Sequence, residues 1–476
     1  MKTPSTAIIA FSLASCALLL YASTSPPLPP AVALLSALVP AAAAEEDDVL
    51  DEDDDGDDDT GDDAGDDGPN DDDSGGDEQD TDDGDSRNGE QPTDDDQYDE
   101  ADSEHTSETG PGPGRSNDND EDLDSQGYIV KMAEILAIDA DDTSLELIEA
   151  LGFAVLRRQN LDALNISIAV IETPAGLSVR EAIRRLRQSD PDALYEFNHL
   201  YQAMPAGGKH HASPDVRQPA MASATGTRLG LIDTAVDTAH ETLRGRRIIQ
   251  QSFVDGDNPP MAHGTSIASL LVGKSGDFQG LLPGATLYSA AVFSQHLSGG
   301  VKASADSLAA ALNWLVKQRV GVINMSLAGP PNALLQVAVR ETLQRGHAVI
   351  AAVGNDGPAA PPLYPAAYAG VIAVTAVDNQ QRIYRRANRG RHVDFAAPGV
   401  KIRAADPRGG YATFSGTSYA APVVSALLAQ RLETPDLARQ RQVLAQLQQQ
   451  AVDLGADGRD PVFGYGLIGE AQYATH

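Results

Sequence analysis

Cysteine is almost absent from this chain of 476 residues. Cys16 is the single cysteine, and it lies in an apolar N-terminal segment. The rest of the chain therefore cannot form an internal disulfide, and cysteine usage does not report the redox compartment. A membrane-length apolar run is also lacking at the N-terminus, since residues 7–22 form a run of about 16 residues where a spanning helix needs about 20.

Positive charge is scarce in one part of the chain only. The net charge is −36, but residues 45–125 hold 39 of the 70 acidic residues and two of the 34 basic ones, so this tract alone carries −37. The remainder is close to neutral. An acidic tract repels phosphate, so this composition argues against nucleic acid as a partner.

The N-terminus has features of an export signal. Lys2 precedes the apolar run 7–22, and a second apolar run ends in Ala41–Ala44, where cleavage fits the small-residue rule. Leu13–Cys16 also resembles a bacterial lipoprotein signal, and an uncleaved membrane anchor is a third reading. We therefore expect residues 1–44 to direct export, with the protein secreted or held at the cell envelope, periplasmic or membrane-anchored.

The acidic tract, residues 45–125, is expected to be disordered. It consists mainly of Asp, Gly, Ser and Thr and lacks the apolar residues that offset the entropy of ordering. Asp51-x-Asp53-x-Asp55 resembles the start of a calcium-binding EF-hand loop, but the twelfth position is Asp62 rather than Glu. A solvated spacer and a loose cation-binding segment both remain as readings.

Residues 126–202 read as a small α+β unit. Residues 166–172 (ISIAVIE) and 194–201 (LYEFNHLY) predict strands, and residues 178–188 (SVREAIRRLRQ) have the apolar period of a helix. Residues 203–226 then become rich in Pro, Gly, Ala, Ser and His without periodicity. This composition predicts a linker and a processing region.

From about residue 227 to 476 the pattern changes to short apolar strands separated by helices. Strands are predicted for LGLID, LYSAAVF, VGVINMSL, AVIAAVGN and GVIAVTAV. Helices are predicted for ADSLAAALNWLVKQ and ALLQVAVRETLQR. This alternation predicts right-handed crossovers and a parallel sheet covered on both faces, which is an α/β domain.

Four side chains at the ends of these elements suggest hydrolysis by an activated serine. That chemistry needs a hydroxyl, a base held by a carboxylate, and donors for the developing oxyanion. Asp233 ends a buried strand, and His263 opens an apolar helix. Ser418 begins another helix, and Asn355 follows a strand. Taken singly, each also fits a capping, turn or surface residue.

Five segments occur in the order LIDTAVD, HGTSIAS, NMSLAG, AAVGNDG and FSGTSYAAP. Their order and spacing resemble those of subtilisin-like serine peptidases, in which aspartate precedes histidine and serine along the chain. Pieces such as VDFAAPGV fit as well, and the resemblance covers about residues 227–470. It implies a three-layer catalytic domain with a mainly parallel sheet and a serine endopeptidase that acts through an acyl-enzyme.

The resemblance also implies the roles of individual residues. Asp233 orients the base, His263 is the general base and then the acid, and Ser418 is the nucleophile. Asn355 and the backbone N–H of Ser418 form the oxyanion hole. The edge segment that pairs with a peptide substrate corresponds to Ser326, Leu327, Ala328 and Gly329. Protein or peptide substrates are the implied partners, and no cofactor or metal ligand is indicated.

Four positions depart from the common family pattern. They are Ala235, Ser266, Ala328 and Tyr419. Ala235 stands in place of glycine after the aspartate motif, and Tyr419 stands in place of methionine after the nucleophile. None removes a catalytic group, but Ala328 and Tyr419 alter the expected specificity pocket.

Residues 126–202 loosely resemble the propeptide domains of the same family. This resemblance implies a self-processed zymogen in which the region acts as an intramolecular inhibitor. An accessory domain without inhibitory role is the alternative for this region. For the whole chain, the alternative is a non-enzymatic binding or adhesion protein that keeps the fold and uses its acidic tract.

Overall fold

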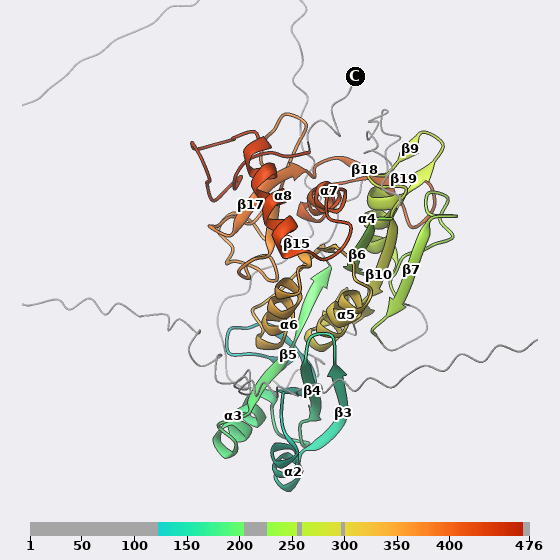
Figure 1. Ribbon diagram of the computed structural model, residues 1–476. Helices are drawn as coiled ribbons and strands as arrows, with labels where there is room; N and C mark the ends of the chain where they lie inside the picture. Colours follow the sequence, from blue (N-terminus) through green and yellow to red (C-terminus); the bar gives the residue numbers. More distant parts are fainter. Residues whose placement is uncertain (1–121, 204–225, 255–258, 297–299, 470–476) are drawn as a thin grey trace, which may run out of the picture. The chain divides into compact units, whose positions relative to one another are not determined.

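The computed structural model describes residues 122–203, 226–254, 259–296 and 300–469 (Figure 1). The predicted signal segment, nearly all of the acidic tract and most of the predicted linker lie outside these residues. None of the described helices is both long and apolar enough to cross a membrane.

The N-terminal domain, residues 122–203, is a small antiparallel sheet covered by two helices. Its strands are β1 (Asp122–Leu123), β2 (Ile129–Ile138), β3 (Ala154–Leu161), β4 (Ile166–Glu172) and β5 (Leu194–Ala203). The helices are α2 (Asp142–Ala150) and α3 (Val179–Ser189). The predicted strand 166–172 and helix 178–188 are confirmed, and the strand predicted for 194–201 continues to Ala203.

The domain begins slightly earlier than the sequence predicts. Asp122 and Leu123 pair with β2, although they were assigned to the disordered tract. The Asp124 carboxylate accepts hydrogen bonds from the backbone N–H groups of Gln126 and Tyr128. These local acceptor contacts order the last acidic residues, because a buried turn needs partners for its free N–H groups.

The second domain, which begins at residue 226 and corresponds to the catalytic domain that the sequence predicts, is built on a seven-stranded parallel sheet. Its order is β17-β16-β15-β13-β6-β10-β7. The strands are β6 (Arg228–Asp233), β7 (Arg247–Ser252), β10 (Thr286–Ala291), β13 (Val322–Met325), β15 (Ala348–Ala352), β16 (Ile372–Val377) and β17 (Val393–Pro398). Two short hairpins stand apart, β8 (Lys274–Ser275) with β9 (Phe278–Gln279) and β18 (Ile402–Ala405) with β19 (Tyr411–Phe414).

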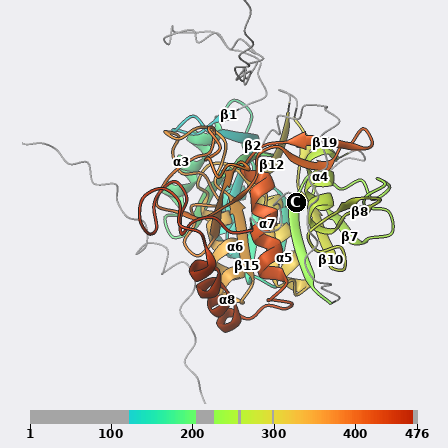
Figure 2. The same cartoon turned by 90° about the horizontal axis from the view of Figure 1, so that it is seen from above.

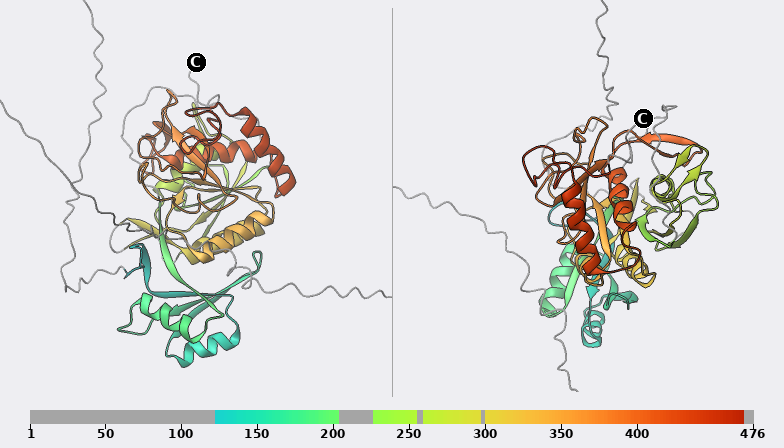
Figure 3. Two further views of the ribbon diagram at one scale, coloured as in Figure 1. Left: turned by 90° about the vertical axis from the view of Figure 1, so that its left-hand side faces the viewer. Right: turned by 45° about the horizontal axis from the view of Figure 1, so that its top comes forward.

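Helices cover both faces of this sheet (Figure 3). α5 (Ala305–Lys317) and α6 (Ala333–Gln344) pack on one face. α4 (Ala262–Val272), α7 (Thr417–Ala429) and α8 (Leu437–Gln450) pack on the other. Within β13, Ile323 joins the first core and Val322 the second. This alternation of side chains confirms the predicted three-layer α/β fold.

Every residue of α7 is buried, and the helix lies close to the middle of the domain in Figure 2. Pro422 lies in the second turn of α7. It has no N–H, so it leaves the carbonyl oxygen of Ser418 without its intrahelical donor. The Ser326 hydroxyl donates to that oxygen at 3.0 Å, which compensates for the proline and fixes the start of α7 against the end of β13.

Strand β5 connects the N-terminal domain to the catalytic domain. It pairs antiparallel with β12 (Val301–Ser304) and with β14 (Leu327–Ala328), and β12 pairs in turn with β11 (Ser294–Gln295). The result is one eight-stranded sheet that contains strands of both domains. One face of the N-terminal sheet packs on α2 and α3, and the other face shares a core with α5 and α6.

Candidate active site

Asp233 is held at the carboxyl end of β6, buried to 1% exposure. One carboxylate oxygen accepts the backbone N–H of Thr234 at 2.6 Å. Both oxygens accept from Nδ1 of His263, at 2.8 and 2.9 Å. A buried carboxylate is costly unless hydrogen-bonded or paired, and this one has both kinds of contact.

His263 is the second residue of α4, and its helix lies unusually close to the strand end that carries Asp233. The N–H of Gly264 donates to the Thr234 hydroxyl at 2.7 Å. A Cβ on Gly264 would lie 2.3 Å from the carbonyl oxygen of Thr234, so only glycine permits this approach. Because Nδ1 faces a carboxylate, it carries the proton, and Nε2 has its lone pair free.

Ser418 is the second residue of α7. Gly416, the residue before the helix, has a φ of 155°, which suits glycine. The Asn355 side chain reaches the same place from the end of β15. Its Oδ1 accepts from the N–H and the hydroxyl of Thr417, at 3.1 and 3.0 Å. These two donors fix the amide orientation, so Nδ2 of Asn355 faces away from Thr417 and remains available as a donor.

The geometry around Gly416 shows that Asn355 and Ser418 are neighbours. The position of a Cβ on Gly416 would be 3.1 Å from Nδ2 of Asn355 and 3.6 Å from Oγ of Ser418. A side chain at 416 would thus fill the space next to both groups. The glycine keeps that space open for a reacting carbonyl group.

Nε2 of His263 and Nδ2 of Asn355 are buried and have no hydrogen-bond partner among the described residues. The hydroxyl of Tyr419, the residue after Ser418, is a third such atom. Nor does any hydrogen bond join His263 to the Ser418 hydroxyl in the described part of the chain, a looseness that unliganded active sites often show. A free acceptor on His263, whose ring meets that of Tyr419 next to Ser418 in the chain, and a free donor on Asn355 are groups that nucleophilic catalysis requires.

The segment Ser326–Gly329 begins beside Ser418 and includes β14, which faces β12 across the end of β5; we call the space between β12 and β14 the groove. The Asn324 amide donates to the Ser326 hydroxyl at 2.9 Å, and that hydroxyl donates to the Ser418 carbonyl. Beyond it, β14 pairs through Leu327 and Ala328 with the end of β5. Leu327 and Ala328 of this predicted segment therefore pair with β5, and Gly329 lies against the ring of Tyr201, which belongs to β5. Ser326 links the segment to Ser418.

Strand β5 occupies the groove between β12 and β14 in the manner of a bound peptide. Gln202 has Lys302 as its partner on one side and Ala328 on the other. Tyr201 is completely buried, and its hydroxyl donates to the carbonyl oxygen of Pro330 at 2.9 Å. Sequence patterns gave no sign of this role, because a strand motif does not reveal its neighbours.

Tyr419 and Ser266, two departures from the family pattern, lie in the same part of the site. The Tyr419 ring is buried, stacks on Phe414 at 5.2 Å and meets the His263 ring edge-on at 5.8 Å. Burial raises the pKa of Tyr419 well above its usual range, the charge of Asp233 raises it further, and the Ser266 hydroxyl lowers it. The phenol is therefore neutral, and its ring supports the imidazole by packing.

No cluster of three or more His, Cys, Asp or Glu side chains in the described ranges has the arrangement of a metal site. The acidic motif that begins at Asp51 lies outside those ranges.

Comparison with known proteins agrees with this geometry. The profile of the subtilase family matches residues 224–466. The chain is 29% identical over 318 residues to the minor extracellular protease Epr of Bacillus subtilis (strain 168), a match that spans 62% of this chain and 48% of Epr. Thermitase of Thermoactinomyces vulgaris is 35% identical over 212 residues, which are 43% of this chain and 74% of thermitase.

A solved structure shows a similar fold. Fervidolysin from Fervidobacterium pennivorans, described as a keratinolytic enzyme related to subtilisin, aligns with a TM-score of 0.63 at 20% identity. The alignment covers 74% of this chain and 62% of fervidolysin. From the family match and the shared fold, we conclude that this chain belongs to the subtilase family of subtilisin-like serine endopeptidases.

Proposed function

We propose that this protein is a serine endopeptidase that cuts peptide bonds with Ser418, His263 and Asp233. The observation that carries the proposal is the pair of unpartnered buried atoms, Nε2 of His263 and Nδ2 of Asn355. Nδ2 borders the same space beside Gly416 as the Ser418 hydroxyl, and the His263 ring packs on Tyr419, the residue after Ser418. Leaving such atoms without partners costs free energy, so a fold retains them where a ligand supplies the partner.

The reaction follows from this arrangement. Oγ of Ser418 attacks the carbonyl carbon of the substrate while Nε2 of His263 takes the hydroxyl proton. Asp233 holds the imidazole through Nδ1 and stabilises the cation that forms. The negative oxygen of the tetrahedral intermediate accepts hydrogen bonds from Nδ2 of Asn355 and from the Ser418 backbone N–H.

The second half of the reaction uses the same groups. His263 returns the proton to the leaving amine, and the peptide bond breaks to leave an acyl-enzyme on Ser418. Water then loses a proton to His263 and attacks the ester carbonyl. Collapse of the second intermediate releases the acid and restores the Ser418 hydroxyl.

The N-terminal domain is proposed to be the inhibitor of this site and to be removed by the enzyme itself. Residues 126–202 would act as propeptide and 203–226 as the processing region. Support comes from β5, which pairs with both walls of the groove and ends at Ala203. A peptide substrate competing for that groove would have to displace it.

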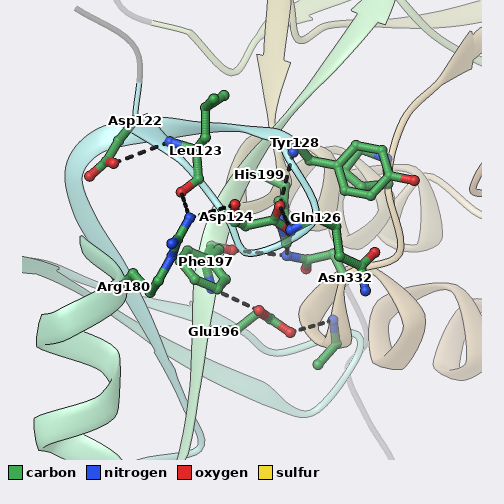
Figure 4. A network of polar contacts seen from close by, with 12 residues as sticks. Asp122, Leu123, Asp124, Gln126, Tyr128, Arg180, Glu196, Phe197, His199 and Asn332 are labelled. Atoms are coloured by element: carbon green, nitrogen blue, oxygen red, sulfur yellow. Dashed lines mark hydrogen bonds and ion pairs between the residues drawn. The ribbon is translucent and has the colours of Figure 1, made fainter. Parts of the chain in front are cut away.

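Polar contacts strengthen this interface (Figure 4). The Glu196 carboxylate accepts the N–H of Ala333 at the N-terminus of α6, where a negative charge is favourable. Asn332 caps the same helix and donates to the carbonyl oxygen of Phe197 at 2.9 Å. It also contacts Nδ1 of His199, whose Nε2 lies 3.1 Å from the Asp124 carboxylate.

A second polar network joins the domains at the start of α5. The buried Asp306 carboxylate contacts the Arg157 guanidinium at 2.5 Å and accepts from Asn198 at 3.1 Å. Burial by itself would raise the pKa of Asp306, but hydrogen bonds from Ser304, Arg157 and Asn198 outweigh it and lower the pKa. These contacts support a chaperone role as well, because they order α5 and α6 before the slow pairing of distant parallel strands.

Export is proposed for the whole protein. The signal-like residues 1–44 support it, and the relative Epr is named an extracellular protease. Secretion and attachment to the envelope differ in the N-terminus of the mature protein. N-terminal sequencing of protein from the culture medium and from membranes distinguishes them.

The endopeptidase proposal can be tested by measuring casein hydrolysis with protein that is expressed from the full-length gene and purified. We expect activity that a serine-directed fluorophosphonate abolishes, with the label on Ser418. Ser418→Ala should retain the circular dichroism spectrum and lose both labelling and hydrolysis. A folded, secreted protein that takes no label and cuts no casein would favour the binding-protein alternative instead.

A further inference from the structure

Four exposed arginines without partners lie on one loop of the catalytic domain. The loop connects β16 to β17, and we call residues 385–391 the arginine loop. Its basic residues are Arg385, Arg386, Arg389 and Arg391. Within the described ranges, none of their guanidinium groups makes an ion pair, a hydrogen bond or a ring contact.

Neighbouring arginines are satisfied, so the arginine loop stands out. Arg382 pairs with Asp378 at 2.8 Å, and Arg459 pairs with Asp394 at 2.8 Å and lies over the Tyr465 ring. By contrast, residues 383–392 contain no acidic residue. Four like charges within seven residues repel one another, and an anionic ligand relieves that repulsion.

Hydrogen bonds tie the arginine loop to the turn that carries Asn355. The N–H of Gly357 donates to the carbonyl oxygen of Arg386 at 2.9 Å. The N–H of Asp356 donates to the buried Asn388 side chain at 2.8 Å, and the N–H of Asn388 donates to the carbonyl oxygen of Gly354 at 3.1 Å. The arginine loop is therefore a direct neighbour of the expected oxyanion site. Asp356 is the single carboxylate of residues 354–361, so positive charge dominates there.

The position of the arginine loop relative to a bound substrate follows from the path of strand β5. Strand β5 fills the groove between β12 and β14 and runs toward Ser326, which contacts Ser418. That groove therefore takes the residues on the N-terminal side of the scissile bond. The arginine loop is not part of this sheet. A substrate that passes Ser418 and the Asn355 turn can reach it with the residues that follow the scissile bond.

We propose that the arginine loop binds acidic side chains within the first three residues after the scissile bond. This inference rests on the proposed endopeptidase activity and adds a substrate class to it: polypeptides with Asp or Glu among the first three residues after the cleavage point. Guanidinium groups suit carboxylates because they present paired N–H donors. Each exposed pair is expected to change the specificity constant by about threefold, so two acidic residues give about tenfold.

Three internally quenched peptides test the proposal. Each begins with Leu-Tyr-Gln-Ala, the residues 200–203 that occupy the groove, followed by one constant residue and the scissile bond. The next three positions contain a constant serine and then Asp-Asp, Gln-Gln or Lys-Lys. With enzyme produced from the full-length gene, kcat/KM should fall in that order, and the ratio of the Asp to the Gln peptide should be about ten at low salt. At about 0.5 M salt the ratio should approach one, because exposed charges are screened.

Two double variants test whether the arginine loop causes the preference for acidic peptides. Arg385→Gln/Arg386→Gln should reduce the Asp-to-Gln ratio at low salt to about two. Arg439→Gln/Arg441→Gln removes two exposed arginines from α8, which begins beside Gly346 at the opposite end of β15 from Asn355, and should leave the ratio unchanged.

The possible outcomes separate the two proposals. An enzyme that cleaves all three peptides at equal rates contradicts the anion-binding role and leaves the endopeptidase assignment intact. A preference for acidic peptides that persists in Arg385→Gln/Arg386→Gln also overturns the role of these residues. Failure to cleave any peptide, together with failure to cleave casein, contradicts the proposed function itself.

Discussion

Buried polar groups have hydrogen-bond partners at the domain interface but lack them at the candidate active site. At the interface, the Asp306 carboxylate has contacts with Arg157, Asn198 and Ser304. At the active site, Nε2 of His263 and Nδ2 of Asn355 have no partner in the described part of the chain. The satisfied groups make contacts between the two domains, whereas the unsatisfied groups are those that we propose bind a reacting substrate. Substitutions at the two places should therefore change different quantities.

The largest effect is expected at Asn355. Asn355→Ala should lower kcat by roughly 10²–10³-fold, a range known for the equivalent change in subtilisin, with little change in KM. The amide stabilises charge that exists only in the transition state. Steady-state kinetics on a neutral peptide measure this.

Thermal unfolding provides the control for Asn355→Ala. The melting temperature should fall by only a few degrees, because the substitution removes the Oδ1 acceptor of the Thr417 N–H and hydroxyl, whereas Nδ2 makes no hydrogen bond. A change confined to KM, or a large loss of stability with kcat retained, would mean that Asn355 is only a turn residue.

A smaller effect is expected at Arg157, and it concerns the stability of the domain interface rather than catalysis. Arg157→Ala leaves the buried Asp306 carboxylate without its cation, whereas Glu134 keeps its ion pair with Lys131. In the unprocessed Ser418→Ala chain, amide hydrogen exchange of β5 and β12 should accelerate by about 10²-fold, less than for a fully buried pair because Arg157 is one-third exposed.

Arg184→Ala is the matched control for the interface. Arg184 is an exposed arginine of the same domain and pairs with Glu181 on its own helix. Exchange in β5 and β12 should not respond to it. If Arg157→Ala also leaves this exchange unchanged, the Asp306 network does not hold the domains together.

The smallest effect concerns a satisfied group inside the catalytic domain. Burial lowers the pKa of His347 to about 4 from 6.5, its contact with the carbonyl oxygen of Val320 opposes the shift, and Arg345 and Arg319 add to it. The unfolded chain takes up this proton below about pH 6.5, while the folded chain resists until about pH 4. The free energy of unfolding therefore falls as the pH drops through this window.

His347→Gln should flatten that dependence and keep a donor for Val320. Between pH 7 and pH 5, the Ser418→Ala parent should lose about 2 kcal/mol more stability than Ser418→Ala/His347→Gln in urea unfolding. Equal losses in the two chains would indicate that His347 is protonated in the folded state.

Much of the catalytic domain could be predicted because its local signals agree with its fold. Buried parallel strands are continuous apolar runs, and β6, β13, β15 and β16 were recognised in this way. Edge strand β7 was missed, because its sequence RIIQQS is mostly polar and exposed. The N-terminal strands β2 and β3 and helix α2 were also not identified.

The contacts of the site could not be derived from the residues alone. Asp233 meets His263 across 30 positions, and Asn355 meets Thr417 across 62. Such contacts depend on how the strand ends converge, and a known family arrangement was needed to anticipate them. The insertion of β5 into the groove and the packing of Tyr419 on His263 depend on tertiary neighbours, for which no local pattern exists.

The N-terminus of the mature protein tests most directly the claim that β5 blocks a working active site. Intact mass and N-terminal sequencing should be compared for wild type and Ser418→Ala expressed from the full-length gene. We predict that wild type begins between residues 204 and 227, while Ser418→Ala keeps the N-terminal domain and has no peptidase activity. The same N-terminus in both proteins would contradict self-processing and with it the role of β5 as an inhibitor that the enzyme itself removes.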